Sequence, residues 1–286
     1  MRQLHFGAHI FLWIDRWNDS SLWLIERAQQ LRLNVLEIAV GDDVSIDVPT
    51  LRRAAKDHQI ALILSPGGDW PMECDISLDD PSLARRGADW HRAWIDVAAE
   101  IGAVAYTGAI YGHPGRVMKR VPPADELPRV ADHLHTLTKF ALERNVELVI
   151  EPMSHFRTHL VNTPAQAIRL IGLANHPNLK VLLDTYHLVT EIRDYAHAIR
   201  TCGKKLWGLH ACENDRGAPG GGLVPWEPVC RALASETAAR YIIFESYNSA
   251  IPGFAESRGM FHDVCADGDV FVRTALRHLQ ALLHQQ

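Results

Sequence analysis

The chain has 286 residues, of which 47% are hydrophobic and 22% are charged, and it carries a formal net charge of −5 at pH 7. This composition is typical of a globular protein, and the length accommodates either two small domains or one large α/β barrel. The negative charge argues against nucleic acid as a partner, and no apolar run reaches the ~20 residues of a membrane span.

The N-terminus and the cysteines give an expectation about the compartment. The first residues, "MRQLHFGAHIFLW", have neither the long apolar core nor the small-residue cleavage site of a signal peptide. The cysteines are odd in number and widely spaced, and no CxxC pair occurs, so neither a disulfide framework nor a structural zinc site is indicated. We therefore expect a reduced, cytoplasmic protein that is not inserted in a membrane.

Eight short apolar runs alternate with longer amphipathic segments from one end of the chain to the other. The runs lack a strict alternation of polar and apolar residues, which is typical of parallel strands that are covered on both faces. The expected strands are residues 4–10, 34–39, 60–65, 103–108, 146–151, 180–184, 206–210 and 241–245.

The segments between these strands have helical patterns and helix-starting residues. We expect helices over residues 21–32, 126–145, 163–174 and 267–284. Asp19 or Ser20 is the expected N-cap of the first of them. The third begins with Thr163 as N-cap and Pro164 at the first helical position, where proline is favoured.

Eight strand–helix units in one chain of this size predict a (β/α)8 barrel, or TIM barrel, formed as a single domain over residues 1–286. A doubly wound open sheet is the alternative. No G-x-G-x-x-G sequence follows the first strand, which weighs against that alternative.

Four consecutive strands of the expected barrel end on residues that can bind a metal ion. The fifth strand ends at Glu151, the sixth at Asp184, the seventh at His210 and the eighth at Glu245. In a barrel, the C-terminal ends of the strands carry the active site, so these side chains are expected to meet at one rim.

A single polar residue at a strand end is most often a loop-facing group or a helix cap. Four such residues on four neighbouring strands are harder to explain in that way. Three carboxylates at one rim would repel one another, and a divalent cation would remove that repulsion. Oxygen and imidazole ligands suit Mn²⁺, Mg²⁺ or Co²⁺. The pattern therefore predicts a metal site.

The spacing of these residues resembles that of the xylose-isomerase-like sugar isomerase/epimerase superfamily, and within it the D-tagatose and D-psicose 3-epimerases. The motifs that carry the resemblance are "LEIAVG" in the second unit, the segment 79–103, "LDTYHL", and "LWGLHACENDRGAPGGGLVPW". The last two match the family's Asp-Thr-aromatic-His sequence, its metal-binding His, and its Gly-rich loop with an Arg and a closing Pro-Trp.

The resemblance implies a divalent-metal-dependent ketose 3-epimerase that acts on a free keto-sugar, with Mn²⁺ as the first choice of metal and Co²⁺ or Mg²⁺ as alternatives. The implied metal ligands are Glu151, Asp184, His210 and Glu245. The two glutamates are also the implied acid and base that exchange the C3 proton through an enediolate. Residues matching His187 and Arg216 bind the ketose oxygens. Members of the family form dimers or tetramers, so a homodimer or homotetramer is expected.

One position departs from the family pattern. The sugar epimerases usually have a glutamate near the O1/O2 end of the substrate, and the corresponding residue here is Arg157. A guanidinium reverses the charge beside the substrate and suits an anion such as a carboxylate or phosphate. Two readings stay open: Arg157 binds an anionic group of the substrate, or it turns away and pairs with an acid on the surface.

Further residues are candidates for the pocket wall. Phe11 follows the first strand with His9 and Trp13, and Trp70 lies after the third strand; each either contacts substrate or serves packing. Other candidates are Glu37, which is either near the site or in a buried ion pair, His113, His155, a mobile substrate-covering loop at 217–226, and the segment 258–269 at the barrel mouth or in an oligomer contact.

Parts of the pattern are also compatible with other functions. The alternative to the lead is an isomerase, epimerase or lyase of the same superfamily that acts on an anionic or glycosidic keto-sugar, and Arg157 is its main support. The superfamily also contains metal-dependent DNA-repair endonucleases, but these need more ligands and a basic groove, which the net charge of −5 argues against. A non-catalytic sugar-binding barrel would not require the complete set of four ligands.

Overall fold

The computed structural model of the chain describes residues 4–284 as a closed barrel of eight parallel strands, which confirms the fold expected from the sequence. The strands are β1 His5–His9, β2 Val35–Val40, β3 Ala61–Pro66, β4 Ala105–Gly108, β5 Glu147–Ile150, β6 Leu179–Asp184, β7 Leu206–Ala211 and β8 Tyr241–Phe244. They pair in sequence order, and β8 closes the barrel by pairing with β1.

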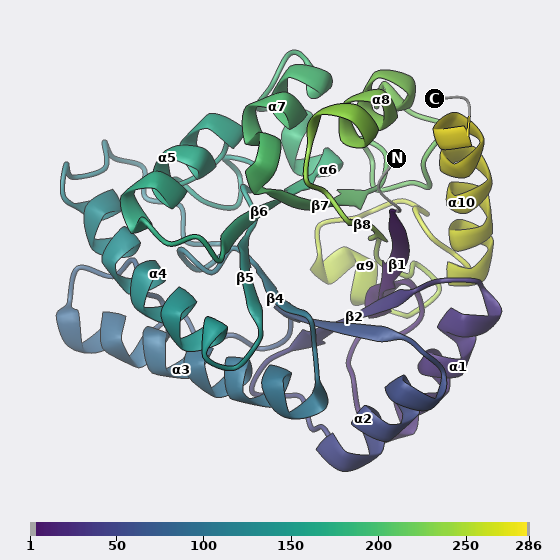
Figure 1. The fold of residues 1–286 in the computed structure, drawn as a ribbon, viewed down its shortest axis with the longest axis horizontal. Helices are drawn as coiled ribbons and strands as arrows, with labels where there is room; N and C mark the ends of the chain where they lie inside the picture. The colour runs from purple at the N-terminus through teal and green to yellow at the C-terminus, as the bar shows by residue number, and fades with distance from the viewer. Residues whose placement is uncertain (1–3, 285–286) are drawn as a thin grey trace.

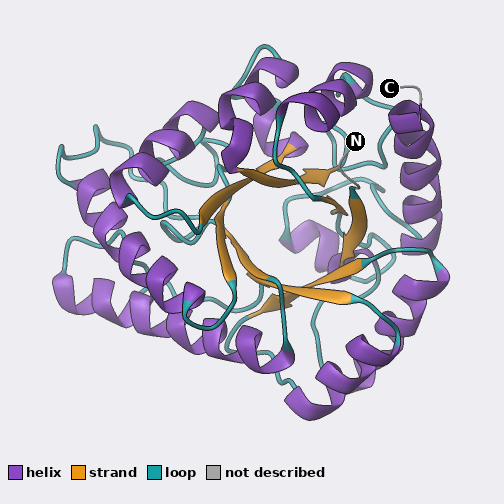
Figure 2. Cartoon of the chain, viewed as in Figure 1, coloured by secondary structure: helices purple, strands orange, loops and turns teal. Residues whose placement is uncertain are grey.

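Helices surround the ring of strands on its outside, and the short helix Phe254–Ser257 is seen within the outline of the ring in this view (Figure 1 and Figure 2). They are α1 Trp23–Gln30, α2 Val48–Asp57, α3 Pro81–Ile101, α4 Glu126–Leu142, α5 Pro164–Ala174, α6 Thr185–Leu188, α7 Tyr195–Cys202, α8 Trp226–Glu236, α9 Phe254–Ser257 and α10 Gly268–His284, with 3-10 turns at Ile10–Leu12, Asp19–Leu22 and Gly203–Lys205. Within the described residues, no helix has the length and apolar character needed to cross a membrane.

The expected helix starts were partly correct. Thr163 caps α5, and its hydroxyl and the Gln166 side chain satisfy each other's backbone N–H groups. The prediction for the first helix was wrong, because Leu22 is at the N-cap of α1 without a capping side chain, and the 3-10 turn Asp19–Leu22 before it is capped by Asn18. Its side chain accepts a hydrogen bond from the Ser20 backbone, and the chain makes a 3-10 turn before α1 begins.

The lower interior of the barrel, toward the N-terminal ends of the strands, is filled by apolar side chains that form one buried cluster. Its buried members are Val35, Ile63, Ala105, Val149, Leu182, Trp207, Tyr241 and Ile243. Gly7 of β1 lies beside this cluster, where a Cβ atom would come within 2.2 Å of Val35 Cγ1 and 2.8 Å of Ile243 Cδ1. β1 therefore has no room for a side chain at this level, and the layer closes without a channel.

The next interior layer is polar on every strand. Side chains on a strand alternate between its two faces, so a residue two positions beyond an interior residue also points inward. In the lower layer the interior positions are Gly7, Val35, Ile63, Ala105, Val149, Leu182, Gly208 and Ile243. Two residues farther along the chain from each of them are, in the same order, His9, Glu37, Ser65, Thr107, Glu151, Asp184, His210 and Glu245. All eight of these residues are buried. The barrel thus places a ring of polar groups on an apolar floor.

Candidate metal centre

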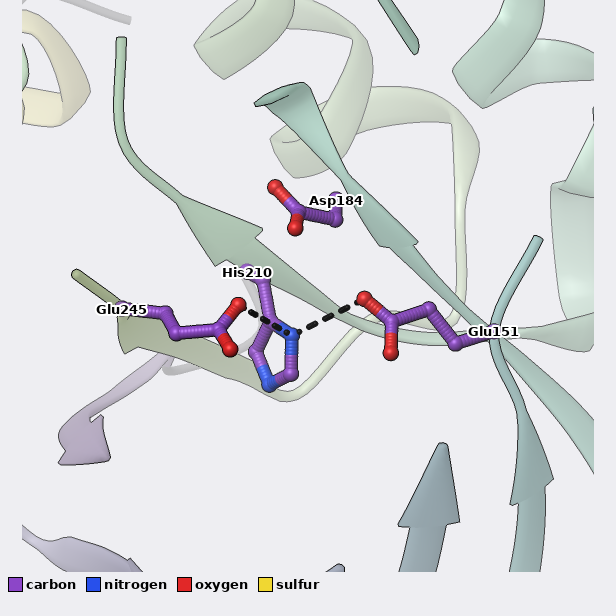
Figure 3. A group of neighbouring side chains, drawn as sticks. All are labelled: Glu151, Asp184, His210 and Glu245. Atoms are coloured by element: carbon purple, nitrogen blue, oxygen red, sulfur yellow. Dashed lines mark hydrogen bonds and ion pairs between the residues drawn. The ribbon is translucent and has the colours of Figure 1, made fainter. Parts of the chain in front are cut away.

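The structure brings together the four side chains that the sequence pattern selected as metal ligands. One possible ligand atom from each of Glu151, Asp184, His210 and Glu245 lies within 4.8 Å of all the others, and all four residues are buried. Asp184 and His210 are register partners on β6 and β7. Glu151 and Glu245 each come one residue after a strand end and approach the His210 imidazole from opposite sides (Figure 3).

Two side chains that can carry positive charge compensate the three carboxylates. His210 Nδ1 lies 3.1 Å from Glu151 Oε1 and 3.2 Å from Glu245 Oε2. Arg216 Nη1 donates to Glu245 Oε2 at 2.7 Å, and its Nη2 lies 2.8 Å from Asp184 Oδ2. Arg216 is itself buried and has a positive φ of 73°, so the backbone is held in an unfavourable conformation that aims this guanidinium at the cluster.

A fourth carboxylate stands behind the histidine. Glu37 Oε2 lies 2.7 Å from His210 Nε2, and Glu37 Oε1 accepts a hydrogen bond from the Thr107 hydroxyl at 2.7 Å. If the Nε2 proton is donated to Glu37, the lone pair of His210 is on Nδ1, the atom that faces Glu151 and Glu245. Carboxylates commonly orient metal-binding histidines in this way.

The pKa values of these groups show how strongly they interact. Burial raises the pKa of Glu151 to about 7, although His210 opposes the shift. The pKa of Glu245 is lowered well below its usual value, because Arg216 and His210 outweigh its burial. The pKa of His210 is raised well above its usual value, because Glu37, Glu245 and Glu151 outweigh its burial. Without a metal ion, a protonated imidazole therefore neutralises part of the acidic charge.

The donor set fits a divalent cation. Two ligands on opposite sides of an ion at ~2.1 Å are separated by ~4.2 Å, so the 4.8 Å limit of this cluster requires only small movements. Asp184 Oδ2 is buried and receives no hydrogen bond of good geometry, although Arg216 forms an ion pair with it. Three carboxylates and one imidazole are the ligand types that suit Mn²⁺, Mg²⁺ or Co²⁺.

Two adjoining cavities open onto the cluster. The larger, of about 250 Å³, has Glu151, His210 and Glu245 in its wall, and the smaller, of about 110 Å³, is lined by Glu151, His187 and Arg216 among others. Of the pocket residues expected from the sequence, Phe11, Trp70, His113 and Arg157 line the larger cavity, and Arg157 also lines the smaller one.

His187 lies beside Asp184, as the spacing of the two residues implied. Its Nε2 is 3.7 Å from Asp184 Oδ2, and its buried Nδ1 has no hydrogen-bond partner within the described residues. Burial and the neighbouring Arg216 lower the pKa of His187 well below its usual value, so the ring is neutral. A neutral imidazole with an unused nitrogen is suited to bind a hydroxyl or carbonyl oxygen.

Several expected pocket residues lie elsewhere. Trp13 directs its indole nitrogen to Asp269 at 3.0 Å, and His155 is exposed and binds Glu191. No residue of the loop 217–226 lines either cavity. Glu213 holds that loop in place, because its carboxylate accepts hydrogen bonds from Gly220, Val224 and Trp226.

Sequence reasoning did not single out Arg258 and Tyr247, which line both cavities. Arg258 follows α9, and its Nη2 donates a hydrogen bond to Gly67 O at 2.8 Å. It is the first residue of the segment 258–269 that was expected at the barrel mouth. Tyr247 lies two residues after Glu245, and the alternation of side chains along a strand could have identified it as the next inward-facing residue. Arg258 lies in an irregular segment where no periodicity applies.

The chain was compared with known proteins. The family model for the xylose isomerase-like TIM barrel matches residues 25–264. The chain is 26% identical over 275 residues to a ketose 3-epimerase from Arthrobacter globiformis, which covers 93% of this chain and 92% of the relative. It is 26% identical over 245 residues to a D-psicose 3-epimerase from Agrobacterium fabrum, which covers 84% of each.

The fold was also compared with solved structures. A structure of L-ribulose 3-epimerase superposes with a TM-score of 0.91 and 24% identity, over 99% of this chain and 95% of the other. At that identity the likeness establishes the barrel and its connections, and it leaves the chemistry to the residues described above.

Proposed function

The chain belongs to the xylose isomerase-like TIM barrel family, and we propose that it is a divalent-metal-dependent 3-epimerase of ketoses. The observation that carries this proposal is the placement of Glu151 and Glu245. The two carboxylates approach one point from opposite sides and are bound to the same imidazole nitrogen (Figure 3). The named epimerases among its relatives support the same reaction class.

Inversion at a carbon beside a ketone requires that a proton leaves one face and that a proton returns to the other. A divalent ion held by Glu151, Asp184, His210 and Glu245 would supply Lewis-acid stabilisation of the negative charge on the keto oxygen. Glu245 accepts the proton from C3 on one face, and Glu151 delivers a proton to the opposite face; in the reverse direction the two exchange roles.

The other residues position the reactants. Arg216 fixes the Glu245 and Asp184 carboxylates through its two terminal nitrogens. His187, with a free Nδ1, binds a substrate oxygen in the smaller cavity. Trp70 and Phe11 form the apolar wall of the larger cavity, against which the carbon chain of the sugar packs. The apolar floor below the cluster keeps bulk water away from the exchanging proton.

The test is deuterium exchange in ²H₂O, followed by NMR at C3 of a ketose. We expect deuterium to enter C3 together with formation of the epimer, to stop after removal of metal with EDTA, and to resume with Mn²⁺ or Co²⁺. Full activity in thoroughly chelated protein would contradict the metal-dependent reaction. Deuterium at C1 in place of C3 would indicate an aldose–ketose isomerase instead.

Three further properties belong to the same proposal. Mn²⁺ is the proposed ion, because a mixed carboxylate and imidazole ligand set suits it. A homodimer or homotetramer is proposed by similarity to the family, and a cytoplasmic location from the five free cysteines, which are all buried and form no disulfide in residues 4–284. Metal analysis of the purified protein and light scattering test the first two.

A further inference from the structure

Arg157 is a partly buried arginine that lines both cavities beside the metal centre. The backbone of Arg157 is fixed, since its N–H donates to Ser154 O at 2.8 Å and its carbonyl accepts from Gly115 at 2.6 Å. Its guanidinium forms no ion pair and no hydrogen bond with any residue between 4 and 284. The reading in which Arg157 pairs with a surface acid therefore does not apply.

Arg258 is a second arginine in the same two cavity walls. It donates one hydrogen bond to Gly67 O and stacks over Phe11, with its Cζ 4.6 Å from the ring centroid. It too has no carboxylate partner within the described part of the chain. Stacking on an aromatic ring fixes the plane of a guanidinium and leaves its other N–H groups available for an acceptor.

Tyr247 shares the walls of both cavities with the two arginines. Tyr247, Arg157 and Arg258 line both cavities, together with Glu151 and Glu245. Arg258 Cζ lies 5.9 Å from the Tyr247 ring centroid. Two uncompensated positive charges therefore lie next to the proposed reacting carbon.

We infer that Arg157, Arg258 and the Tyr247 hydroxyl form an anion subsite, and that the substrate is a 2-keto-sugar acid whose carboxylate is attached to the keto carbon. This inference rests on the proposed epimerase function and names its substrate class. Because the subsite adjoins Glu151 and Glu245, the anion belongs to the end of the sugar nearest the exchanging proton. A bound neutral ketose would offer these guanidiniums hydroxyl oxygens but no negative charge to balance their own.

The charge of the subsite favours a carboxylate over a phosphate. A carboxylate has one negative charge and two oxygens, which matches the fork of one guanidinium with help from a second. A phosphate dianion would need more donors, but Arg258 already uses one nitrogen for Gly67, and the exposed Asp69 lines the same cavity.

The subsite also meets an electrostatic need of the proposed reaction. When the C3 proton leaves a 2-keto acid, negative charge develops beside a carboxylate that is already negative. Guanidiniums placed at that carboxylate reduce the repulsion, and they do so most in the transition state, where the charge is largest.

The test compares three ketoses with metal-loaded protein, by deuterium entry at C3. D-Fructose, 2-keto-D-gluconate and D-fructose 6-phosphate are used, because the second differs from the first only in the oxidation of C1 to a carboxylate. We expect kcat/KM to be highest for 2-keto-D-gluconate. The preference for the acid over D-fructose should fall about 10- to 100-fold in Arg157→Gln and in Arg258→Gln, as for loss of a hydrogen bond to a charged group.

Arg157→Lys keeps the charge and should retain part of the preference, while Arg52→Gln, on the exposed face of α2, should leave it unchanged. A preference for D-fructose that neither substitution alters would overturn the anion subsite and leave the proposed epimerase standing. Fastest exchange with D-fructose 6-phosphate would overturn the assignment to a carboxylate.

Calorimetric titration with D-gluconate and D-sorbitol measures the subsite without turnover. These compounds lack the ketone, so they report binding alone. D-Gluconate should bind at least about tenfold more tightly than D-sorbitol, and Arg157→Gln should remove that difference. If this result were found while no ketose exchanged its C3 proton, the subsite would hold and the proposed epimerase function would fail. Equal binding of the two compounds would overturn the subsite.

Discussion

Glu37 acts on the metal centre through another residue. It contacts His210 Nε2 and is held by the Thr107 hydroxyl, so it fixes which nitrogen of the imidazole carries the proton. We predict that Glu37→Gln weakens Mn²⁺ binding about 10- to 100-fold, the range found for such supporting partners. Calorimetric titration with Mn²⁺ measures the effect.

The matched variant is Thr107→Val, which keeps Glu37 but removes its hydrogen bond and should have a smaller effect in the same direction. Were Glu37 only one half of a buried ion pair, Glu37→Gln would lower the free energy of unfolding and leave the affinity for Mn²⁺ unchanged.

The two glutamates that approach His210 differ from the other ligands in their proposed task. Substitution by glutamine keeps the shape of the side chain and one oxygen for a metal, but the amide cannot accept and return a proton. We predict that Glu245→Gln and Glu151→Gln each lower kcat for C3 exchange at least about 10²- to 10⁴-fold, the usual contribution of a positioned acid or base.

The control is Glu227→Gln, an exposed position on α8 that forms an ion pair with Arg231 on the same helix. Circular dichroism establishes that each variant is folded. Near-native exchange in either Glu151→Gln or Glu245→Gln would contradict the two-carboxylate mechanism.

The elements of the barrel were largely predictable from the sequence, and physical reasons explain which were not. A buried parallel strand reads as an apolar run, so each of the eight expected strands matches an observed strand to within two residues at either end. Asp184, His210 and their two glutamates were found because they end such runs. Thr107 and Ser65 were missed, although they lie two residues beyond Ala105 and Ile63, because a hydroxyl at a strand end carries no distinctive signal.

Contacts made by irregular segments were not predictable. Arg258 reaches the site because α9 and the loop after it fold back against Gly67, a contact across 191 residues of sequence. The loop 217–226 was expected over the pocket on account of its glycines. In the structure Glu213 binds its backbone, and a Cβ atom on Gly220 would come within 2.8 Å of His278 on α10.

The packing of α3 on β4 places a histidine where it cannot be charged. His91 of α3 is fully buried, and its Nδ1 lies 3.0 Å from the Tyr106 hydroxyl of β4. Burial lowers the pKa of His91 from 6.5 to about 3. Between these two pH values the unfolded chain binds a proton at His91 that the folded chain does not bind. The free energy of unfolding therefore decreases as the pH falls from 6.5 toward 3.

We predict that His91→Phe makes the free energy of unfolding less dependent on pH in this interval, by up to ~1.4 kcal/mol per pH unit, which is the effect of one proton. Urea unfolding at pH 7, 6, 5 and 4 measures the slope. His197→Phe, at an exposed position of α7, is the control and should not change it. Equal slopes for the native protein and His91→Phe would mean that His91 does not resist protonation in the folded state.

At the scale of the whole molecule, the residues that stabilise the barrel and the residues of the proposed reaction lie in two different layers of its interior. The lower layer is apolar and fills the space, whereas the layer above it is polar on all eight strands. The lower layer contributes hydrophobic stabilisation, and the upper layer concentrates like charges that oppose folding until they are compensated. A bound cation would thus act on the stability of the entire barrel, since its ligands come from β5, β6, β7 and β8 or the residues that follow them.

This coupling predicts a thermal shift. A ligand that binds only the folded chain adds about 2.7 kcal/mol at a concentration of 100 times its Kd, which corresponds to roughly 4 to 5 °C for a protein of this size. We therefore expect Mn²⁺ to raise the Tm of EDTA-treated protein by several degrees in differential scanning calorimetry. The shift should vanish in Glu151→Gln/Asp184→Asn, which lacks two ligands, and persist in Asp132→Asn on the exposed face of α4. An unchanged Tm with Mn²⁺, Co²⁺ and Mg²⁺ alike would mean that the four side chains hold no cation in the folded state, and the proposed chemistry would then have to proceed on Arg216 and His210 alone.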